Sequence, residues 1–494
     1  MHKKLPIFYS AILLTCVNLL LRFVSTSFQV YLSGRIGAEG IGLLQLVLSV
    51  GSMAMVAGMA GIRTATMYLT AEEHGRNQKK NTLWVISGCL RYSLVCSISV
   101  GVLVYTFAPF VAEHWIGNLH TVDSIRLFAV FLPINCLCGV MVGYFTGAGR
   151  IVTLAAVEVI EQLFSMVCTL TLLSLWGKES AEKACLCVVL GSGLGACLTL
   201  LCLCFLRLRH AEKPGNRIPL LKRLYQTAVP LAVADDLRTG ITTVENLMVP
   251  KRLARYPGEI SPLASYGIVC GMVFPILTFP LAILFGLTEL LIPELARCNA
   301  AGSRKRICYL VKKSLKIALL FGCLCGGILF LTSQWLCEKL YANALAGTYL
   351  KWFAPLAVLL YCDSVTDAMI KGLGQQKMSV RYNIFTNILD VLFLFFLLPR
   401  YGIKGYFFSF LITHVINFLL SIGRLLRITK IAIPMHIPLL TLLVACTGVF
   451  LCTSLKNAYT ATFSYCGILL CGLFLTGILK SEDLRWVKGL LQKK

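Results

Sequence analysis

Apolar runs of about 20 residues recur along the whole chain, separated by short polar connections. A run of this length is what an α-helix needs to cross the hydrocarbon core of a membrane. The runs cover residues 7–31, 41–69, 82–112, 124–146, 151–176, 184–206, 221–249, 262–293, 308–333, 350–370, 382–399, 402–423, 435–455 and 461–479. The pattern predicts an all-α polytopic membrane protein of about fourteen transmembrane helices.

The composition agrees with this pattern. Of the 494 residues, 57% are hydrophobic and only 14% are charged, whereas soluble domains carry about 25% charged residues. The charge deficit extends over the whole length, and no segment is left over that could form a soluble domain. A membrane enzyme such as a glycan polymerase needs a sizeable outer loop for its catalytic groups, and the connections here are short. We therefore expect no catalytic residues.

The net charge of +24 is explained by its distribution. If both termini are cytoplasmic, about 30 of the 46 Lys and Arg residues fall in cytoplasmic segments, as the positive-inside rule requires. The densest clusters, at residues 207–223 and 297–316, lie on that side, and the exception is Lys251, Arg252 and Arg255. This distribution favours anionic membrane lipids or a phosphorylated lipid over nucleic acid as the partner.

Metals and bound cofactors are not expected. Most of the 22 cysteines lie inside apolar runs, where Cys behaves as a small hydrophobic residue, and no C-x-x-C pair is present. The chain has no G-x-x-x-x-G-K-[ST] motif, so it does not bind ATP through a P-loop. Transport would then be driven by a coupling ion (H⁺ or Na⁺), by the membrane potential or by the gradient of the substrate.

An internal repeat relates the two halves of the chain. A shift of 225 residues superposes glycine on glycine six times without a gap, including Gly101 on Gly326 and Gly147 on Gly372. The shift carries each helix onto the sixth helix after it, so the halves are parallel repeats. We expect two six-helix lobes, at residues 1–210 and 211–430, followed by two further helices and a basic cytoplasmic tail at 431–494.

Matched polar stripes suggest that the repeats enclose a cavity. The helix at 151–176 carries Glu158, Glu161, Gln162 and Ser165 on one face, and the shift places these on Asn383, Thr386, Asn387 and Asp390. Polar faces within a membrane are costly unless they meet protein or water. The alternative is that these side chains hydrogen-bond between helices without any cavity.

Arg22 lies well inside the first apolar run, on one face with Asn18 and Gln29. An unpaired charge at that depth costs at least about 2.5–3.5 kcal/mol. We expect Arg22 to face water or an anionic ligand, and the alternative is a structural pair with a carboxylate on another helix. Arg63 and Arg238 are further candidates for the cavity wall.

The helix at 221–249 carries Asp235, Arg238 and Glu245 on one face. A stripe of mixed sign suits ion or proton coupling, and it also suits an internal salt bridge between Asp235 and Arg238. Asp363 and Asp367 precede Lys371 at i, i+4, i+8, a spacing that favours internal pairing near the cytoplasmic mouth. The candidates for binding a coupling ion are Asp235, Glu245, Asp363, Asp367 and Asp390.

Several short motifs resemble those of the stage V sporulation protein B-like polysaccharide transporters, within the multidrug/oligosaccharidyl-lipid/polysaccharide (MOP) flippase superfamily. Tyr31-Leu32-Ser33 and Gly37-Ala38-Glu39-Gly40-Ile41-Gly42 resemble the start of their second helix. Further matches are Val249-Pro250-Lys251-Arg252, Phe279-Pro280-Leu281, Lys371-Gly372-Leu373-Gly374-Gln375 and Tyr401-Gly402-Ile403-Lys404-Gly405. The resemblance covers about residues 8–425.

The resemblance implies two lobes around a central cavity, alternating access and a cargo of the undecaprenyl-pyrophosphate-saccharide class. This class includes precursors of the cell wall and of spore cortex peptidoglycan. Arg22 matches the first arginine of helix 1 in the related lipid II flippases, whereas Phe28 and Pro275 stand where these flippases have further arginines. The departures leave open which lipid-linked glycan is carried.

The preferred interpretation is a monomeric, multi-pass flippase of the cell membrane that exports a lipid-linked saccharide. The alternative is a cation-coupled multidrug exporter with the same MATE-like fold, whose carboxylates at Asp235, Glu158 and Glu161 would face organic cations. The sign of the cavity wall separates the two, because a positive wall favours pyrophosphate. The tail at 481–494 is predicted to form a basic helix at the membrane surface.

Overall fold

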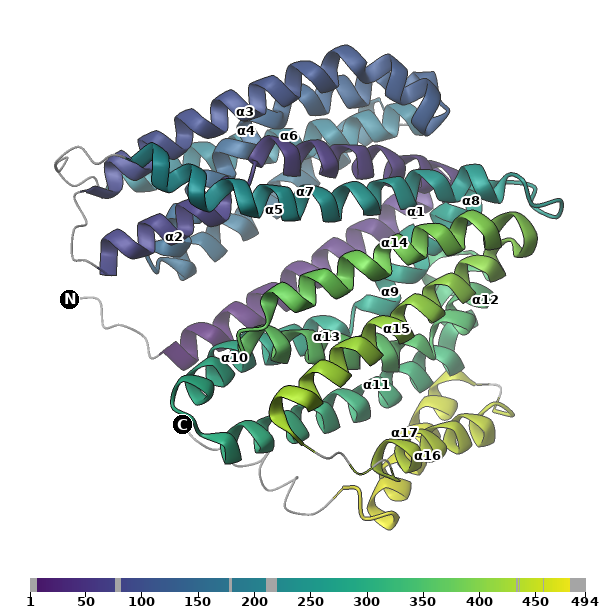
Figure 1. Ribbon diagram of the computed structural model, residues 1–494. Coiled ribbons are helices and arrows are strands. Elements are labelled where there is room, and N and C mark those ends of the chain that lie inside the picture. The colour runs from purple at the N-terminus through teal and green to yellow at the C-terminus, as the bar shows by residue number, and fades with distance from the viewer. Residues whose placement is uncertain are drawn as a thin grey trace. The chain divides into compact units, whose positions relative to one another are not determined.

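The computed structural model describes residues 7–75, 81–176, 180–209, 220–431, 434, 436–455 and 457–479. These residues are almost entirely helical, and no strand occurs among them (Figure 1). The predicted basic tail at 481–494 lies outside the described residues. Helices alone satisfy every backbone N–H and C=O group within one segment, which is why a chain this apolar adopts them in a membrane.

The elements follow one another with short connections. They are α1 (Ile7–Met59), α2 (Ile62–Gly75), α3 (Thr82–Phe110), η2 (Val111–Ile116), η3 (Leu119–Thr121), α4 (Val122–Gly147), α5 (Ile151–Leu175), α6 (Ala181–Leu208), α7 (Leu220–Leu253), α8 (Pro262–Ile268), η4 (Val269–Val273), α9 (Phe274–Thr278), α10 (Leu281–Ala300), α11 (Arg304–Tyr341), α12 (Ala344–Phe353), α13 (Leu356–Gly372), α14 (Gln376–Tyr401), α15 (Ile403–Thr429), α16 (His436–Cys452) and α17 (Ala458–Leu475). Each of the predicted apolar runs falls on one or more of them.

The prediction of an all-α polytopic membrane protein is confirmed. Within the described residues, nine helices are long and apolar enough to cross a membrane, or up to eleven if each bent pair is one span. The count of fourteen stays a prediction. The 34-residue α7 is not among these spans, because four charged residues lie near its middle, at Asp235, Asp236, Arg238 and Glu245.

The chain forms two compact units. The first contains Met1–Gly271 and Asn387–Tyr406, and the second contains Met272–Thr386 and Phe407–Lys494. The first unit thus holds α1 to α8 together with the second half of α14. The predicted lobe boundaries at residues 210 and 430 stay a prediction.

Glycine and proline divide several of the apolar runs. The run at 41–69, expected as one helix, is interrupted at Ala60 and Gly61, which have φ of 44° and 70°. A β-carbon at Gly61 would lie 2.9 Å from the backbone nitrogen of Ala232 and closer still to the carbonyl oxygen of Ala228. Only glycine combines this left-handed conformation with direct backbone contact to α7.

The core of the first unit is packed around α4. In Figure 1, α3 and α4 run side by side. One buried cluster joins α2, α3, α4 and α7 through residues that are at most 3% exposed, namely Ile62, Ala65, Leu69, Val85, Cys89, Val140, Leu224 and Ala228. Cys89 is completely buried among the apolar side chains of this cluster and packs there as a small hydrophobic residue.

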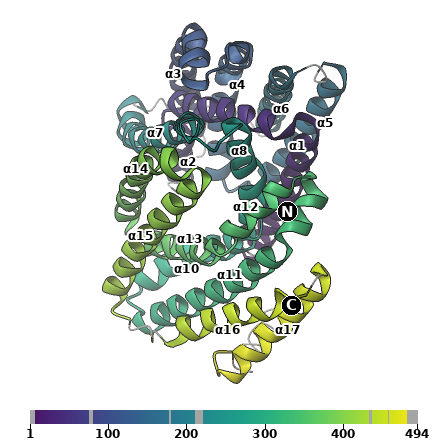
Figure 2. The same ribbon diagram turned by 90° about the vertical axis from the view of Figure 1, so that its right-hand side faces the viewer.

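In the second unit, α16 and α17 pack against α11 (Figure 2). The ring of Tyr465 is completely buried beside Gly327 of α11, and its hydroxyl donates a 2.7 Å hydrogen bond to the carbonyl oxygen of Cys323. In the same unit α12 and α13 meet at an angle of 55°, with Pro355 at the start of α13. Proline lacks the N–H that a continuous helix would need at that point.

The predicted repeat is visible in matching backbone contacts within the two units. A β-carbon at Gly101 would lie 3.1 Å from the carbonyl oxygen of Ala129, and one at Gly326 would lie 3.1 Å from that of Ala354. Residues 129 and 354 are themselves separated by the repeat distance of 225. The packing of α3 on α4 therefore recurs between α11 and the junction of α12 and α13.

A second pair of glycines gives the same result. A β-carbon at Gly147 would meet the carbonyl oxygen of Met67 at 2.5 Å, and one at Gly372 would meet that of Ile292 at 2.9 Å. Again 292 is 67 plus the repeat distance. Glycine was thus retained at both places because two helix backbones touch there, which is a steric requirement.

The packing of Gly61 gives the first prediction. We expect Gly61→Ala to lower the thermal stability of the purified protein more than Gly149→Ala. Both glycines have similar φ, 70° and 72°, so both variants carry the cost of about 1–2 kcal/mol for a left-handed alanine. Only at Gly61 must the backbone of α7 also move, because Gly149 has nothing within 4 Å of its β-carbon position. Melting curves of the detergent-solubilised variants measure the difference, and equal melting temperatures would contradict the packing argument.

Candidate functional site

Two acidic side chains meet inside the first unit, where α7 passes α14. The side chains of Glu245 and Asp390 interact with each other, and Asp390 is only 7% exposed, whereas Glu245 is half-buried. Two carboxylates that lie this close repel each other, and a proton on one of them would remove the repulsion and allow a hydrogen bond between them. A cation between them would relieve the same repulsion. Both residues were coupling candidates, and the structure brings them together.

Polar side chains from α8, η4 and α15 surround this carboxyl pair. Tyr266 and Tyr406 are 1% and 4% exposed, and both interact electrostatically with Glu245. The Cys270 Sγ lies 3.9 Å from the Tyr406 hydroxyl oxygen, and it also interacts with Tyr266. The carboxyl pair thus lies in a largely buried polar cluster, in which each hydroxyl or thiol can both donate and accept a hydrogen bond.

The cluster is tied to α1 through the main chain and side chain of Ser49. The Thr243 hydroxyl donates to the carbonyl oxygen of Ser49 at 3.2 Å, and the Asn246 amide donates to the Ser49 hydroxyl at 2.8 Å. Nearer the N-terminus of α1, the Gln29 amide donates to the carbonyl oxygen of Gly271 at 2.9 Å. Gln29, predicted to line the cavity, therefore hydrogen-bonds to the π-helical segment that carries Cys270.

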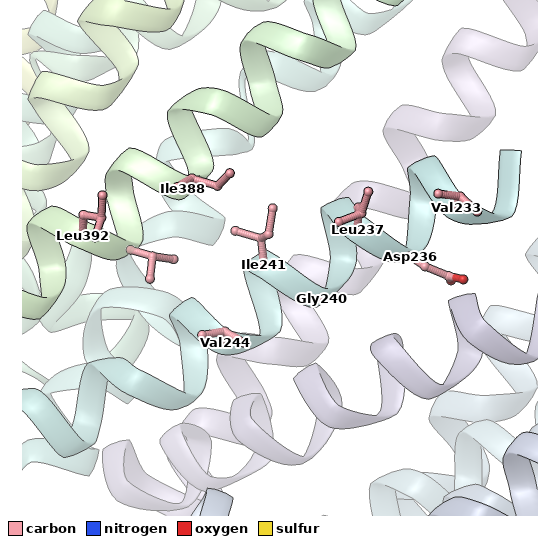
Figure 3. Close-up of a pocket in the computed structure, with 9 residues that line it drawn as sticks. Val233, Asp236, Leu237, Gly240, Ile241, Val244, Ile388 and Leu392 are labelled. Atoms are coloured by element: carbon pink, nitrogen blue, oxygen red, sulfur yellow. The ribbon is translucent and has the colours of Figure 1, made fainter. Parts of the chain in front are cut away.

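An apolar groove lies between α7 and α14, on the surface of the first unit (Figure 3). It has a volume of about 610 Å³ and is lined by Val233, Asp236, Leu237, Gly240, Ile241, Val244, Ile388, Val391 and Leu392. Asp236 supplies the one carboxylate of the lining. Val244 and Val391 are the chain neighbours of Glu245 and Asp390, so the groove runs directly beside the carboxyl pair.

Three predicted cavity residues lie near one another on α2 and α5. Arg63 is exposed, Glu158 and Glu161 are half-buried, and both Arg63 and Glu161 interact electrostatically with Glu158. Among these three groups the carboxylates outnumber the guanidinium. This patch therefore cannot on its own form the positive wall expected for pyrophosphate recognition.

Arg22 is half-buried at the middle of the straight part of α1. It lies fifteen residues after Ile7 and fifteen before the kink at Gly37, where φ is 71° and ψ is 179°. At 1.5 Å per residue, about 22 Å of helix extends on each side. Arg22 thus lies at mid-length of this part of α1, its depth in the membrane stays a prediction, and the side chain of Asn18 lies outside the described residues.

The remaining charges of α7 are on its surface. Asp235 and Arg238 are both exposed, and Thr242 donates to the carbonyl oxygen of Arg238 at 3.1 Å. Within the described residues no ion pair joins Asp235 to Arg238, so the internal salt bridge considered from the sequence is not formed. Asn387 is half-buried on α14.

The two aspartates of α13 have partners in the second unit. Asp363 accepts a 2.9 Å hydrogen bond from the Asn417 amide, and Asp367 forms a 2.6 Å ion pair with Lys371. The Ser379 hydroxyl also donates to Asp367. The expected internal pairing at i, i+4 is therefore confirmed for Asp367, and this pairing offers a structural account of the residue that does not need a coupling ion.

Sequence reasoning missed Tyr266, Cys270 and Tyr406. All three lie in apolar helices, where phenols and thiols contribute little to a polar stripe, and their role depends on which helices are neighbours. Tyr406 does lie beside Gly405, which belongs to one of the motifs noted in the sequence, and Tyr266 lies beside Gly267. An aromatic hydroxyl next to a close-packed glycine was thus the one available signal.

Two family models match the chain in succession. The model described as "Polysaccharide biosynthesis protein" matches residues 8–233, and the MatE model matches residues 241–396. Stage V sporulation protein B of Bacillus subtilis (strain 168) is 23% identical over 436 residues, covering 85% of this chain and 84% of that protein.

Solved structures of transporters share the fold. The inward closed conformation of the lipid II flippase MurJ has a TM-score of 0.69 at 13% identity and covers 95% of this chain and 100% of its own. An inward-facing multidrug resistance MATE transporter has a TM-score of 0.64 at 14% identity, covering 85% of this chain and 100% of its own. These relatives are transporters and not enzymes. The chain is a multi-span membrane protein that shares the fold of these transporters, and its two halves are similar to the polysaccharide biosynthesis and MatE families of the multidrug/oligosaccharidyl-lipid/polysaccharide flippase superfamily.

Proposed function

We propose that this transporter moves a lipid-linked saccharide across the cell membrane, with an undecaprenyl-pyrophosphate-glycan as the cargo class. The observation that carries the proposal is the half-buried Arg22 at mid-length of α1. The match to the polysaccharide biosynthesis family and the fold shared with a lipid II flippase support the same cargo class.

An arginine at this depth is costly unless it binds something charged or polar. The guanidinium is planar and presents five N–H donors, which match the oxygens of a phosphate bidentately. Each charge-assisted hydrogen bond contributes about 1.5–3 kcal/mol. A pyrophosphate offers more acceptor oxygens than one arginine can use, so the Arg22 guanidinium can donate to it bidentately as the cargo passes.

We place both termini in the cytoplasm, because the clusters at residues 207–223 and 297–316 then fall on the inner side. With this orientation α7 begins at the inner face and ends at the outer face. The saccharide would be loaded inside and released outside by alternating access of the two repeats.

The coupling ion is proposed to bind at Glu245 and Asp390. Either a proton shared by the two carboxyl groups or a Na⁺ between them would remove the repulsion that two buried carboxylates impose on each other. The pair connects α7 to α14, so binding and release of the ion would change the contact between two helices. Exposed Asp235 and paired Asp367 are weaker candidates on these grounds.

A multidrug exporter is the second candidate function, and one feature favours it. The groove between α7 and α14 is apolar and carries a single carboxylate, Asp236, which suits an organic cation. Loss of dye efflux from cells in Asp236→Asn, with glycan export unchanged, would favour this second function over the first.

The cargo itself is tested in a strain that lacks the gene. Lipid-linked precursors should accumulate on the inner leaflet, since the step that moves them outward is missing. Extraction and mass spectrometry of these lipids identify the glycan. If no lipid-linked saccharide accumulates while sensitivity to cationic drugs rises, the flippase proposal is wrong.

Arg22→Ala should reduce glycan export at least tenfold in a complementation assay, because about two charge-assisted hydrogen bonds to phosphate are lost. Arg22→Lys should retain part of the activity, since it keeps the charge but not the bidentate geometry. The matched control is Arg91→Ala, which removes an exposed arginine of α3. Full export by the Arg22→Ala variant, at equal amounts of folded protein, would exclude Arg22 from the path.

Glu245→Gln and Asp390→Asn should each abolish the dependence of transport on its ion gradient, and the double variant should be no worse than either single one. Residues that share one ion act as a unit, so their effects are not additive. Transport into proteoliposomes under imposed pH and Na⁺ gradients measures this and distinguishes the two ions. Glu289→Gln, at an exposed carboxylate of α10, is the control. Additive losses would show that the two carboxyl groups do not hold a common ion.

A further inference from the structure

A cationic pocket lies at the end of α7, within the first unit. It has a volume of about 390 Å³ and is lined by Met53, Trp115, Thr243, Val244, Leu247, Met248, Lys251, Arg252 and Arg255. The lining contains three cations and no carboxylate. Within the described residues none of these cations forms an ion pair. Three like charges gathered without a counter-ion define a site for an anion.

The local contacts hold this rim in place. Lys251 donates from its Nζ to the carbonyl oxygen of His114, at the end of η2. The Arg252 guanidinium lies over the ring of Phe395, with its Cζ 3.2 Å from the ring centroid. Stacking uses the flat face of the guanidinium and leaves its N–H groups, which point outward in the plane, able to donate to an anion.

The residues of the pocket follow one face of α7. Val244, Leu247 and Met248 are apolar, Lys251 and Arg252 continue the same i, i+3, i+4 series beyond them, and Arg255 lies in the turn that follows α7. The face is thus apolar first and cationic at the end of the helix. Trp115, 38% exposed, adds an amphipathic ring of the kind enriched at the level of lipid headgroups.

The same face continues backwards into the apolar groove between α7 and α14. Val244 lines both the groove and the cationic pocket. At 100° per residue, the α7 residues of the two sites, apart from Asp236 and Thr243, fall within an arc of about 140°. An apolar groove that ends in three cations is complementary, in shape and in charge, to a lipid with a phosphate headgroup.

The position of the cations gives an independent argument. In the orientation proposed above, this is the outer end of α7, where lysine and arginine are normally rare. The cluster is the main exception to the charge distribution of the chain. A role in binding an anion explains why these cations occur on the side of the membrane where the positive-inside rule predicts few of them.

We propose that this face of α7 binds one phosphate-bearing membrane lipid, with its headgroup at Lys251, Arg252 and Arg255 and its chain in the groove beside Gly240 and Ile241. The ligand is either an anionic phospholipid or a polyprenyl phosphate, since both share this chemistry. The site is separate from Arg22 and from the carboxyl pair, and lipid binding here does not depend on which cargo is transported.

The test is lipid binding to the purified full-length protein, measured by native mass spectrometry. The probes are phosphatidylglycerol, undecaprenyl phosphate, zwitterionic phosphatidylcholine and inorganic phosphate. We expect one bound phosphatidylglycerol or undecaprenyl phosphate, with at least tenfold weaker binding of phosphatidylcholine. Tight binding of only one of the two anionic lipids identifies the source of the ligand, and either result supports the site. Equal binding of phosphatidylcholine, or equally tight binding of inorganic phosphate, would overturn the proposal.

Two variants separate headgroup from chain. The double variant Arg252→Gln, Arg255→Gln should weaken binding of the anionic lipids at least tenfold. Gly240→Leu should also weaken it, because a β-carbon at Gly240 meets nothing within 4 Å, so a leucine fits there and fills the groove without disturbing the fold. Gly467→Leu is the matched control, at a helical glycine of α17 with equally open surroundings. Unchanged lipid binding by the Gly240→Leu variant would show that the lipid chain does not lie in the groove. Because no variant is scored by transport, these outcomes are distinguishable from failure of the proposed flippase function.

Discussion

The cost of keeping charge in hydrocarbon governs how α7 is built. A charged side chain at mid-membrane costs at least about 2.5–3.5 kcal/mol, so each one must be paired, solvated or bound to a ligand. The helix meets this requirement differently along its length, since Glu245 interacts with Asp390, whereas Asp235 and Arg238 are exposed. A helix with these charges would not insert stably as an isolated span, and it depends on its neighbours in the first unit.

The sequence predicted those properties that depend on one helix or on one repeat distance. Apolar run length gave the helices, and the 225-residue shift gave contacts such as Gly101 with Ala129 and Gly326 with Ala354. The polar stripes of the sequence also indicated Glu245 and Asp390, separately, as candidates for binding a coupling ion. Their pairing could not be predicted, because 145 residues separate them and nothing in the spacing of either helix says which faces meet. The break at Gly61 was missed for the same reason, since its cause is the backbone of α7.

Close backbone packing and buried polar groups are linked in this fold. Where glycine lets two helices touch, few side chains can separate them, and polar groups can reach across. A β-carbon at Gly267 would lie 2.6 Å from the backbone nitrogen of its repeat partner Gly42, and the adjacent Tyr266 belongs to the polar cluster. Such a contact keeps the distance between α1 and α8 fixed, so the hydrogen bonds of the cluster need little reorganisation to accept or release a proton.

On α7 the proposed ion site and the proposed lipid site occupy adjacent faces. Glu245 follows directly after Val244, which lines both the groove and the cationic pocket, and Asp390 precedes Val391 on the opposite wall. A lipid chain that holds α7 and α14 apart would change the distance between the two carboxyl groups, and an ion that draws them together would narrow the groove. Coupling between two sites is reciprocal, so the affinity for the ion must change by the same factor as the affinity for the lipid. Because one helix carries both faces, no longer path through the protein is needed to connect them.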